Sequence, residues 1–349
     1  MSYIIAIGLY LVLLMVYGLV IAHKKVKTTD DMMTGGHKIP FIILVGSLLA
    51  TWCGGGGITG SAGVVYSGGP WVGVLTFAAP PIGIILLYFI AGKVRKSNKL
   101  TVPEIMGARY GTAASIISAL CVMLAYVGVL ATQLKAAANI LVLLCHSSGI
   151  EISHGVALAI CTVIIVIITV GGGLVSVAYS DAVSALIMIG GFFLAIPILM
   201  RAASAQGAVL PAEKTTFTGG MSGWTLLGYF LPSLALMLGD QNMLQRFASA
   251  KNSDEAKKSN IGMFIGEIMV IASIVAVATQ AAKLYPTLDT PSNVIFQVAV
   301  DYLPMVFGAL VMCACMAFIV TTADSYLLSS ATNLTNDIYV KYINKNATD

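Results

Sequence analysis

Two interruptions of apolar segments carry the residue types best suited to bind an ion or a small solute. Residues 50–57 read ATWCGGGG, and residues 320–325 read VTTADS. Glycine is a poor helix former, so four successive glycines leave backbone carbonyl and N–H groups without assured helical partners. Lipid supplies no partners, so such a stretch persists only where it is buried in protein or lines a polar cavity. Broken helices at mid-membrane form the ion and substrate sites of secondary transporters, and the pattern therefore predicts solute transport.

Hydroxyl groups cluster in the second interruption. Thr321 and Ser325 are four residues apart and share one face of a helix, with Thr322 beside them. One interpretation is that each hydroxyl bonds to a carbonyl one turn earlier, as is common for Ser and Thr in membrane helices. The other is a site for a hard cation, which prefers several oxygen ligands. The glycine break favours the cation site, because it supplies free carbonyls.

Ionisable residues are rare and costly inside a membrane, so each is a candidate functional residue. Asp240 follows Gly239 in a segment already loosened by Pro232, which predicts a second broken helix with an acid near the break. Alternatively, Asp240 lies near the cytoplasmic end of its span and is held by Arg246. Glu267 has no motif around it. The full set within apolar segments is Lys135, Asp181, Asp240, Glu267 and Asp324.

Helical periodicity turns Lys135 away from a solute pathway. If Tyr126 faces the pathway, Gln133 is seven residues further on and shares its face. Lys135 is nine residues further on, which is about 180° away at about 100° per residue. We therefore expect Lys135 to reach water or an acid on a neighbouring helix.

Composition places the chain among polytopic α-helical membrane proteins. It is 58% hydrophobic and 10% charged, with a mean hydropathy of +0.92. Soluble domains carry about 25% charged residues. All but the fifth of its apolar segments are near or above the roughly 20 residues that cross a bilayer. The predicted spans are residues 3–22, 41–66, 71–92, 113–145, 154–170, 178–200, 224–245, 260–282 and 304–340.

The placement of basic residues predicts the topology. If the spans alternate in direction, most of the 19 Lys and Arg residues fall on one side of the membrane. The exceptions are Arg201, Lys214 and Lys283 on the other side, and Lys135 within a span. Cytoplasmic loops are the basic ones. We therefore expect a multi-pass protein of the cytoplasmic membrane with its N-terminus outside and its C-terminus inside.

Other chemistries find no support in the sequence. It contains no phosphate-binding G-x-x-x-x-G-K-[ST] loop, no H-E-x-x-H zinc motif and no convincing nucleophile, histidine and acid set, so we do not expect an enzyme. The six cysteines form no C-x-x-C pair and are expected to be packing residues. The basic loops are explained by topology, so no nucleic-acid partner is expected. The expected partners are the lipid bilayer and a small solute.

Five motifs, in order along nearly the whole chain, resemble those of the sodium:solute symporter family. They are TGGHKIP at 34–40, LTVPE at 100–104 with RYG at 109–111, TVGGGLVSV at 169–177 followed by Ser180 and Asp181, QRFA at 245–248, and TTADS at 321–325. No single motif is decisive, whereas five in the family's order are a strong resemblance.

The resemblance implies an all-α polytopic membrane protein of the leucine-transporter type. That fold has two inverted repeats of five helices, here preceded by one extra N-terminal helix. The resemblance also implies a sodium site and an inward ion path through Asp181. The implied sodium ligands are the carbonyls of Ala50, Cys53 and Phe318 and the hydroxyls of Thr321 and Thr322. The implied substrate residues are Trp52, Gly56, Gly57, Tyr126, Asp240 and Gln241.

The substrate class follows from a narrower resemblance. Residues 50–57 and 173–181 are particularly similar to the high-affinity choline transporter branch, in which aromatic side chains enclose a quaternary ammonium group. Trp52 and Tyr126 would be two such walls. The chain departs from that branch at residues 239–242, where an acid stands in the region of a further aromatic residue. We expect a cationic or zwitterionic amine as the solute.

The second repeat is expected to be incomplete. Residues 1–349 form one transport domain: residues 1–40 hold the extra helix and the first cytoplasmic loop, residues 41–201 the first repeat, and residues 224–341 three helices of the second. Family members continue for several more helices.

The two breaks and the hydroxyl cluster make sodium-coupled symport by alternating access the leading prediction. The alternative is a non-transporting or truncated membrane module that binds or senses its ligand with sodium.

Overall fold

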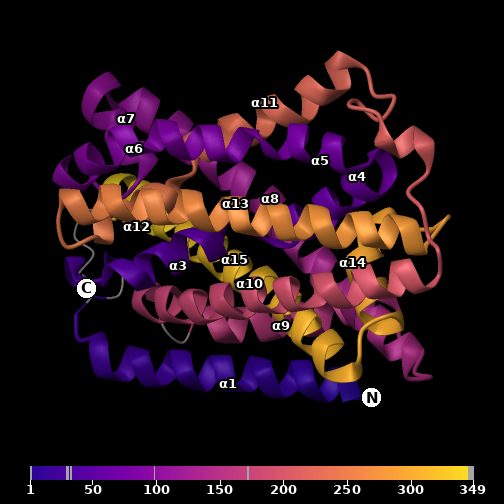
Figure 1. Cartoon of the computed structure of the whole chain (residues 1–349). Helices are drawn as coiled ribbons and strands as arrows, with labels where there is room; N and C mark the ends of the chain where they lie inside the picture. The colour runs from indigo at the N-terminus through magenta and orange to yellow at the C-terminus, as the bar shows by residue number, and fades with distance from the viewer. Residues whose placement is uncertain (1, 29–30, 32–33, 98, 171–172, 345–349) are drawn as a thin grey trace.

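The protein, seen here as a computed structural model, consists of helices joined by loops within the described residues 2–28, 31, 34–97, 99–170 and 173–344 (Figure 1). Its α-helices are α1 (Ser2–Lys25), α3 (Phe41–Trp52), α4 (Ser61–Gly68), α5 (Pro70–Phe77), α6 (Ala79–Ser97), α7 (Val102–Tyr110), α8 (Thr112–Ser147), α9 (His154–Val170), α10 (Gly173–Ala205), α11 (Gly223–Gly239), α12 (Gln241–Ser249), α13 (Ser253–Leu284), α14 (Val294–Asp301) and α15 (Met305–Thr332). Short 3₁₀ helices are η1 (Gly35–His37), η3 (Ala212–Thr215) and η4 (Pro291–Asn293), and π-helices are η2 (Gly56–Gly60) and η5 (Asn333–Ile343).

Each of the nine predicted spans contains a helix or a pair of helices. By length and composition, six helical segments within the described residues are able to cross a membrane, and the bent pair formed by residues 41–52 and 56–68 is a seventh. The remaining two predicted spans contain α9 and α11, each of 17 residues. The protein is therefore a multi-pass membrane protein.

The first predicted break is present, and side chains from other helices satisfy its backbone groups. The chain bends by 59° between residues 41–52 and 56–68. The Gly55 N–H donates to Gln133 Oε1 on α8 at 2.6 Å, and Thr322 Oγ1 on α15 donates to the Ala50 carbonyl at 3.0 Å. Thr59 Oγ1 donates to the Gly55 carbonyl at 2.6 Å. The bend is stable in an apolar surrounding because protein groups replace the partners that lipid cannot provide.

The second predicted break lies at Asp240. Here the backbone is extended (φ −71°, ψ 111°), so α11 ends and α12 begins on either side of this one residue. Its carboxylate Oδ1 accepts the N–H of Asn242 at 2.8 Å and so caps α12. Pro232 lies inside α11 without ending it. The acid that caps the next helix therefore sets the position of the break.

The centre of the bundle is α15. In its most apolar stretch 72% of residues are buried, against 17% for α8 and 22% for α1. The extra N-terminal helix α1 lies along the edge of the bundle (Figure 1). It is attached by close packing at Gly18, where an added Cβ would lie 2.6 Å from Ser176 Oγ, and by the hydrogen bond of 3.1 Å between Tyr10 and Ser184. Among the described segments long enough to cross a membrane, the one that carries the predicted hydroxyl cluster is thus the most enclosed by protein.

One end of the bundle gathers the basic loops. Arg95 Nε, near the end of α6, donates to the Ala250 carbonyl at 2.5 Å. His37 Nδ1 lies 2.6 Å from the Ala248 carbonyl. Ile39 forms a bridge with Ala250. These contacts hold the end of α12 against the last turn of α6 and the loop that precedes α3. The basic end is therefore closed around α12.

We predict that Gly54→Ala destabilises the protein. The added methyl carbon would lie 2.8 Å from both Gln133 Nε2 and Thr322 Cγ2. Overpacking of this kind costs about 1–3 kcal/mol. The matched control is Gly57→Ala, because no atom lies within 4 Å of its added carbon. Thermal unfolding of the purified protein should give a lower melting temperature for the first variant, and equal values for both would contradict the close approach of α8 and α15 to the break.

Candidate functional site

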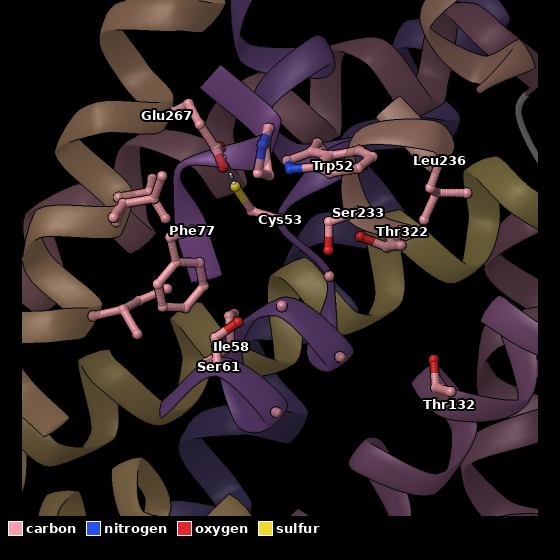
Figure 2. Close-up of a pocket in the computed structure, with 18 of the residues that line it drawn as sticks. Trp52, Cys53, Ile58, Ser61, Phe77, Thr132, Ser233, Leu236, Glu267 and Thr322 are labelled. Carbon is pink, nitrogen blue, oxygen red and sulfur yellow. Dashed lines mark hydrogen bonds between the residues drawn. The ribbon is translucent and has the colours of Figure 1, made fainter. Parts of the chain in front are cut away.

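A cavity of about 530 Å³ opens at the first break (Figure 2). This volume is in the range of pockets that hold small organic ligands. Its walls come from α3, η2 and α4 on both sides of the break, and from α5, α6, α8, α11, α13 and α15. Gly57 and Gly60 leave open space where a side chain would be, so the backbone itself forms part of the wall.

The lining is mostly apolar and aromatic, with few polar groups. Four rings line it, from Trp52, Phe77, Tyr229 and Tyr326, and its carboxyl group is that of Glu267. Hydroxyl and amide groups complete the lining, from Ser61, Thr76, Thr132, Gln133, Ser233 and Thr322. A few polar groups in an apolar pocket fix the orientation of a small solute.

Two of the predicted sodium ligands, the Ala50 carbonyl and the Thr322 hydroxyl, meet where α3 ends against α15. Thr322 Oγ1 lies 3.0 Å from the Ala50 carbonyl and 3.3 Å from that of Thr51. One residue earlier on α15, Thr321 Oγ1 donates to the Phe318 carbonyl at 3.4 Å. Both threonines are at most 2% exposed. The structure thus joins Ala50 and Thr322 across two helices. Thr321 and Ser325, in contrast, each bond to a carbonyl one turn earlier on α15, as the alternative interpretation has it. The Cys53 thiol points to Glu267 (Figure 2).

Three of the predicted substrate residues line the cavity, and three lie beyond it. Trp52, Gly56 and Gly57 are in the wall. Asp240 is 1% exposed and accepts hydrogen bonds from Tyr126 Oη at 2.6 Å and from Tyr326 Oη at 2.7 Å. The rings of these tyrosines pack edge to face at 4.5 Å, and Tyr326 also lines the cavity. Tyr126 and Asp240 therefore form a second layer behind Tyr326.

Gln241 lies further toward the basic end. Its Oε1 accepts the N–H of Val102 at 3.1 Å, and its Nε2 donates to Asn333 Oδ1 at 2.8 Å. These contacts tie the start of α12 to α7 and to η5. In this conformation the side chain holds the closed end together and does not face the cavity.

A buried ion pair lies between α10 and α12. Arg246 Nη2 lies 3.1 Å from Asp181 Oδ2, and both side chains are at most 1% exposed. Ser47 Oγ donates to the same Asp181 oxygen at 2.6 Å and accepts from Arg246 Nε at 2.8 Å. Arg246 Nη2 also donates to Ser325 Oγ at 2.7 Å, which lies 3.2 Å from Thr51 Oγ1. The predicted ion-path acid is therefore linked through hydrogen bonds to the turn that bears the predicted sodium ligands.

Arg246 does not hold Asp240, which was the alternative placement of that acid. The guanidinium pairs with Asp181 on α10, whereas Asp240 is held by two tyrosines. Spacing along one chain does not reveal which of two buried acids an arginine reaches. Residue spacing did not predict the roles of Arg246 and Tyr326 for this reason. Arg246 lies within the QRFA motif, and Tyr326 directly follows the TTADS motif.

The helical periodicity of α8 is confirmed. Gln133 is 2% exposed and lines the cavity, while Lys135 is exposed. All six cysteines are free, and Cys121 is the exposed one.

The arrangement defines a class of protein: a helical membrane protein with two broken spans beside a central cavity, in the leucine-transporter-type fold. A solved structure of a Na⁺-coupled sialic acid symporter, described as a substrate-bound outward-open state, superposes with a TM-score of 0.80 at 18% identity. The superposition covers 98% of this chain and 74% of that one. A nucleobase-cation-symport-1 family transporter in a closed conformation gives a TM-score of 0.65 at 14% identity, over 89% of this chain and 70% of that one. The predicted fold class is confirmed.

The chain belongs to the sodium:solute symporter family, whose model matches residues 32–349. The high affinity choline transporter 1 of Homo sapiens is 25% identical over 348 residues, covering 92% of this chain and 58% of the relative. That of Drosophila melanogaster is 24% identical over 365 residues, covering 96% and 56%. The sodium/sialic acid symporter NanT of Aliivibrio fischeri is 23% identical over 370 residues, covering 99% and 71%. The chain thus spans less than three fifths of the length of these two choline transporters.

We predict that Arg246→Met strongly destabilises the protein, because it leaves the buried Asp181 carboxylate without its ionic partner. Breaking a buried pair from one side costs about 3–5 kcal/mol. Adding Asp181→Asn removes the uncompensated charge, so the double variant should unfold at a higher temperature than Arg246→Met alone. Thermal unfolding in one detergent checks both values. A double variant no more stable than the single one would argue against direct pairing.

Proposed function

We propose that the protein carries out sodium-coupled symport of a small organic solute by alternating access. The observation that carries this proposal is the contact of Thr322 Oγ1 with the Ala50 carbonyl at the edge of the cavity. A carbonyl freed by a helix break and a hydroxyl from a second helix are oxygen ligands of the kind a hard cation prefers. Family membership and the sodium-coupled structural neighbour support the choice of sodium as the coupling ion.

The proposed solute is a small amine with a positive charge, alone or as part of a zwitterion. Aromatic rings attract cations through the negative faces of their π-systems, and the cavity is lined by four rings. The choline transporters among the relatives support this class.

The proposed direction of release is toward the basic end, which is cytoplasmic if the positive-inside rule holds for this chain. In this arrangement the N-terminus lies outside and the C-terminus inside. The Arg246–Asp181 pair and the layer of Tyr126, Tyr326 and Asp240 close that end. Release requires these contacts to separate, since they stand between the proposed sodium ligands and the basic loops.

Uptake into proteoliposomes tests the proposal. Radiolabelled choline, proline and a pool of small amines are presented with an inward sodium gradient or with potassium in its place. Accumulation that requires the sodium gradient supports symport. Uptake indifferent to sodium would sink the proposal, and sodium-dependent binding without accumulation would favour the alternative, a ligand-binding or sensing module.

We predict that Thr322→Val raises the sodium concentration needed for half-maximal binding or uptake by about tenfold or more, which corresponds to about 1.4 kcal/mol. Valine keeps the shape of the side chain and removes the hydroxyl. The matched control is Thr322→Ser, which keeps the hydroxyl and should stay close to the wild type. An unchanged sodium requirement in the valine variant would remove Thr322 from the ligand set.

A further inference from the structure

Glu267 is a buried acid in the cavity wall with no ionic partner among the residues that the structure describes. Its side chain lies near the middle of α13 and is 3% exposed. The ion pairs of the described chain are Lys99 with Glu104, Arg246 with Asp181, and Lys341 with Asp337. An ionised carboxylate is costly to bury without a counter-charge. The site therefore has a negative group whose charge a bound cation is able to balance.

Close packing of α13 on α3 brings this acid to the break. An added Cβ on Gly266 would lie 2.9 Å from Leu49, so the small residue lets the two helices approach. The next residue, Glu267, then reaches the turn at which α3 ends. There the Cys53 thiol donates to Glu267 Oε2 at 3.1 Å, as the dashed line in Figure 2 shows.

The hydrogen-bond partner of the Glu267 carboxyl group is a donor, so the group keeps acceptor capacity toward the cavity. The Cys53 thiol donates to Glu267, and Trp52 is the residue before Cys53 in the chain. An ionised carboxylate only accepts hydrogen bonds and offers about four lone-pair sites, so the one thiol donor leaves it with further capacity. Trp52 also lines the cavity, which places an aromatic ring and the acid at the same wall.

We propose that Glu267 is the group that binds the positive charge of the solute, with Trp52 as the aromatic surface beside it. The solute class is then an organic cation with an ammonium group, and the site distinguishes it from an uncharged molecule of the same shape. This inference rests on the proposed function for the identity of the cavity as the solute site. It assigns recognition of charge to α13, and not to Asp240, whose two oxygens accept hydrogen bonds from Tyr126 and Tyr326.

The test compares two ligands of one shape and different charge. Choline and 3,3-dimethylbutan-1-ol differ in having nitrogen or carbon at the branched centre. Titration calorimetry on the purified protein, with sodium present, should show choline binding about 30-fold more tightly, as expected for a charge-assisted contact. In Glu267→Gln the preference should fall to about threefold or less, because the charge is removed at nearly constant shape.

A matched control separates charge recognition from general damage. Glu255→Gln makes the same chemical change in the first turn of the same helix, outside the cavity lining, and should keep the wild-type preference. If Glu267 served only to support the fold, its variant would weaken both ligands equally and leave their ratio unchanged, which would overturn the proposal. A wild-type protein that binds none of choline, tetramethylammonium and ethanolamine would overturn it as well.

A second measurement uses the wild-type protein and does not depend on how the variant folds. A hydrophobic carbodiimide labels carboxyl groups in apolar surroundings, and mass spectrometry of the Glu267 peptide reports the labelling. Choline should protect Glu267, whereas 3,3-dimethylbutan-1-ol at the same concentration should not. Equal labelling with and without choline would overturn the proposal.

The outcomes separate this inference from the proposed function. A charge preference that depends on Glu267, without sodium-driven accumulation, would refute symport and leave the assignment of Glu267 in place. Sodium-driven uptake with an unchanged preference in Glu267→Gln would refute the assignment alone.

Discussion

The structure depends on one constraint: backbone groups freed by a broken helix inside a membrane must find partners in the protein. Two helices supply partners at both breaks: to backbone groups at the first, and to the Asn242 N–H and the Asp240 carboxylate that caps α12 at the second. From α8, Gln133 accepts the Gly55 N–H and Tyr126 reaches Asp240. From α15, Thr322 donates to the Ala50 carbonyl and Tyr326 donates to Asp240. The same pair of helices therefore contacts both breaks, so a shift of α8 against α15 changes the contacts at both breaks together.

Polar contacts are distributed unevenly along the bundle. On the side of the basic end, α12 is buried along its whole length, and its side chains bond to α3, α10, α15 and η5. On the other side of the breaks, Gly56, Gly57 and Gly60 are exposed at the cavity, and α11 is mostly exposed. Closing a cavity at one end while leaving it open at the other is what one state of an alternating-access cycle requires.

Sequence reasoning located the helices and both breaks, because hydropathy and glycine or acid interruptions act locally along the chain. It did not reveal which distant groups pair. Asp240 was expected to touch the solute since it follows a break, yet its carboxylate caps α12 and is enclosed by Tyr126 and Tyr326. Glu267 lacked any motif because its importance comes from the helix it faces: α13 packs on α3 through Gly266. Such pairings depend on tertiary geometry, which residue spacing in one sequence does not contain.

The last turn of α3 joins the two sites of the proposed function. Its Ala50 carbonyl belongs to the proposed sodium ligands, and the thiol of Cys53, the residue after its last one, donates to Glu267. An ion that orders this turn also orders the group that holds the carboxylate. Such coupling is reciprocal, so a cation at Glu267 stabilises the same turn for sodium to the same extent. The glycines that follow interrupt the helix after this turn. In the proposed function, this interruption allows binding at one site to change the affinity of the other.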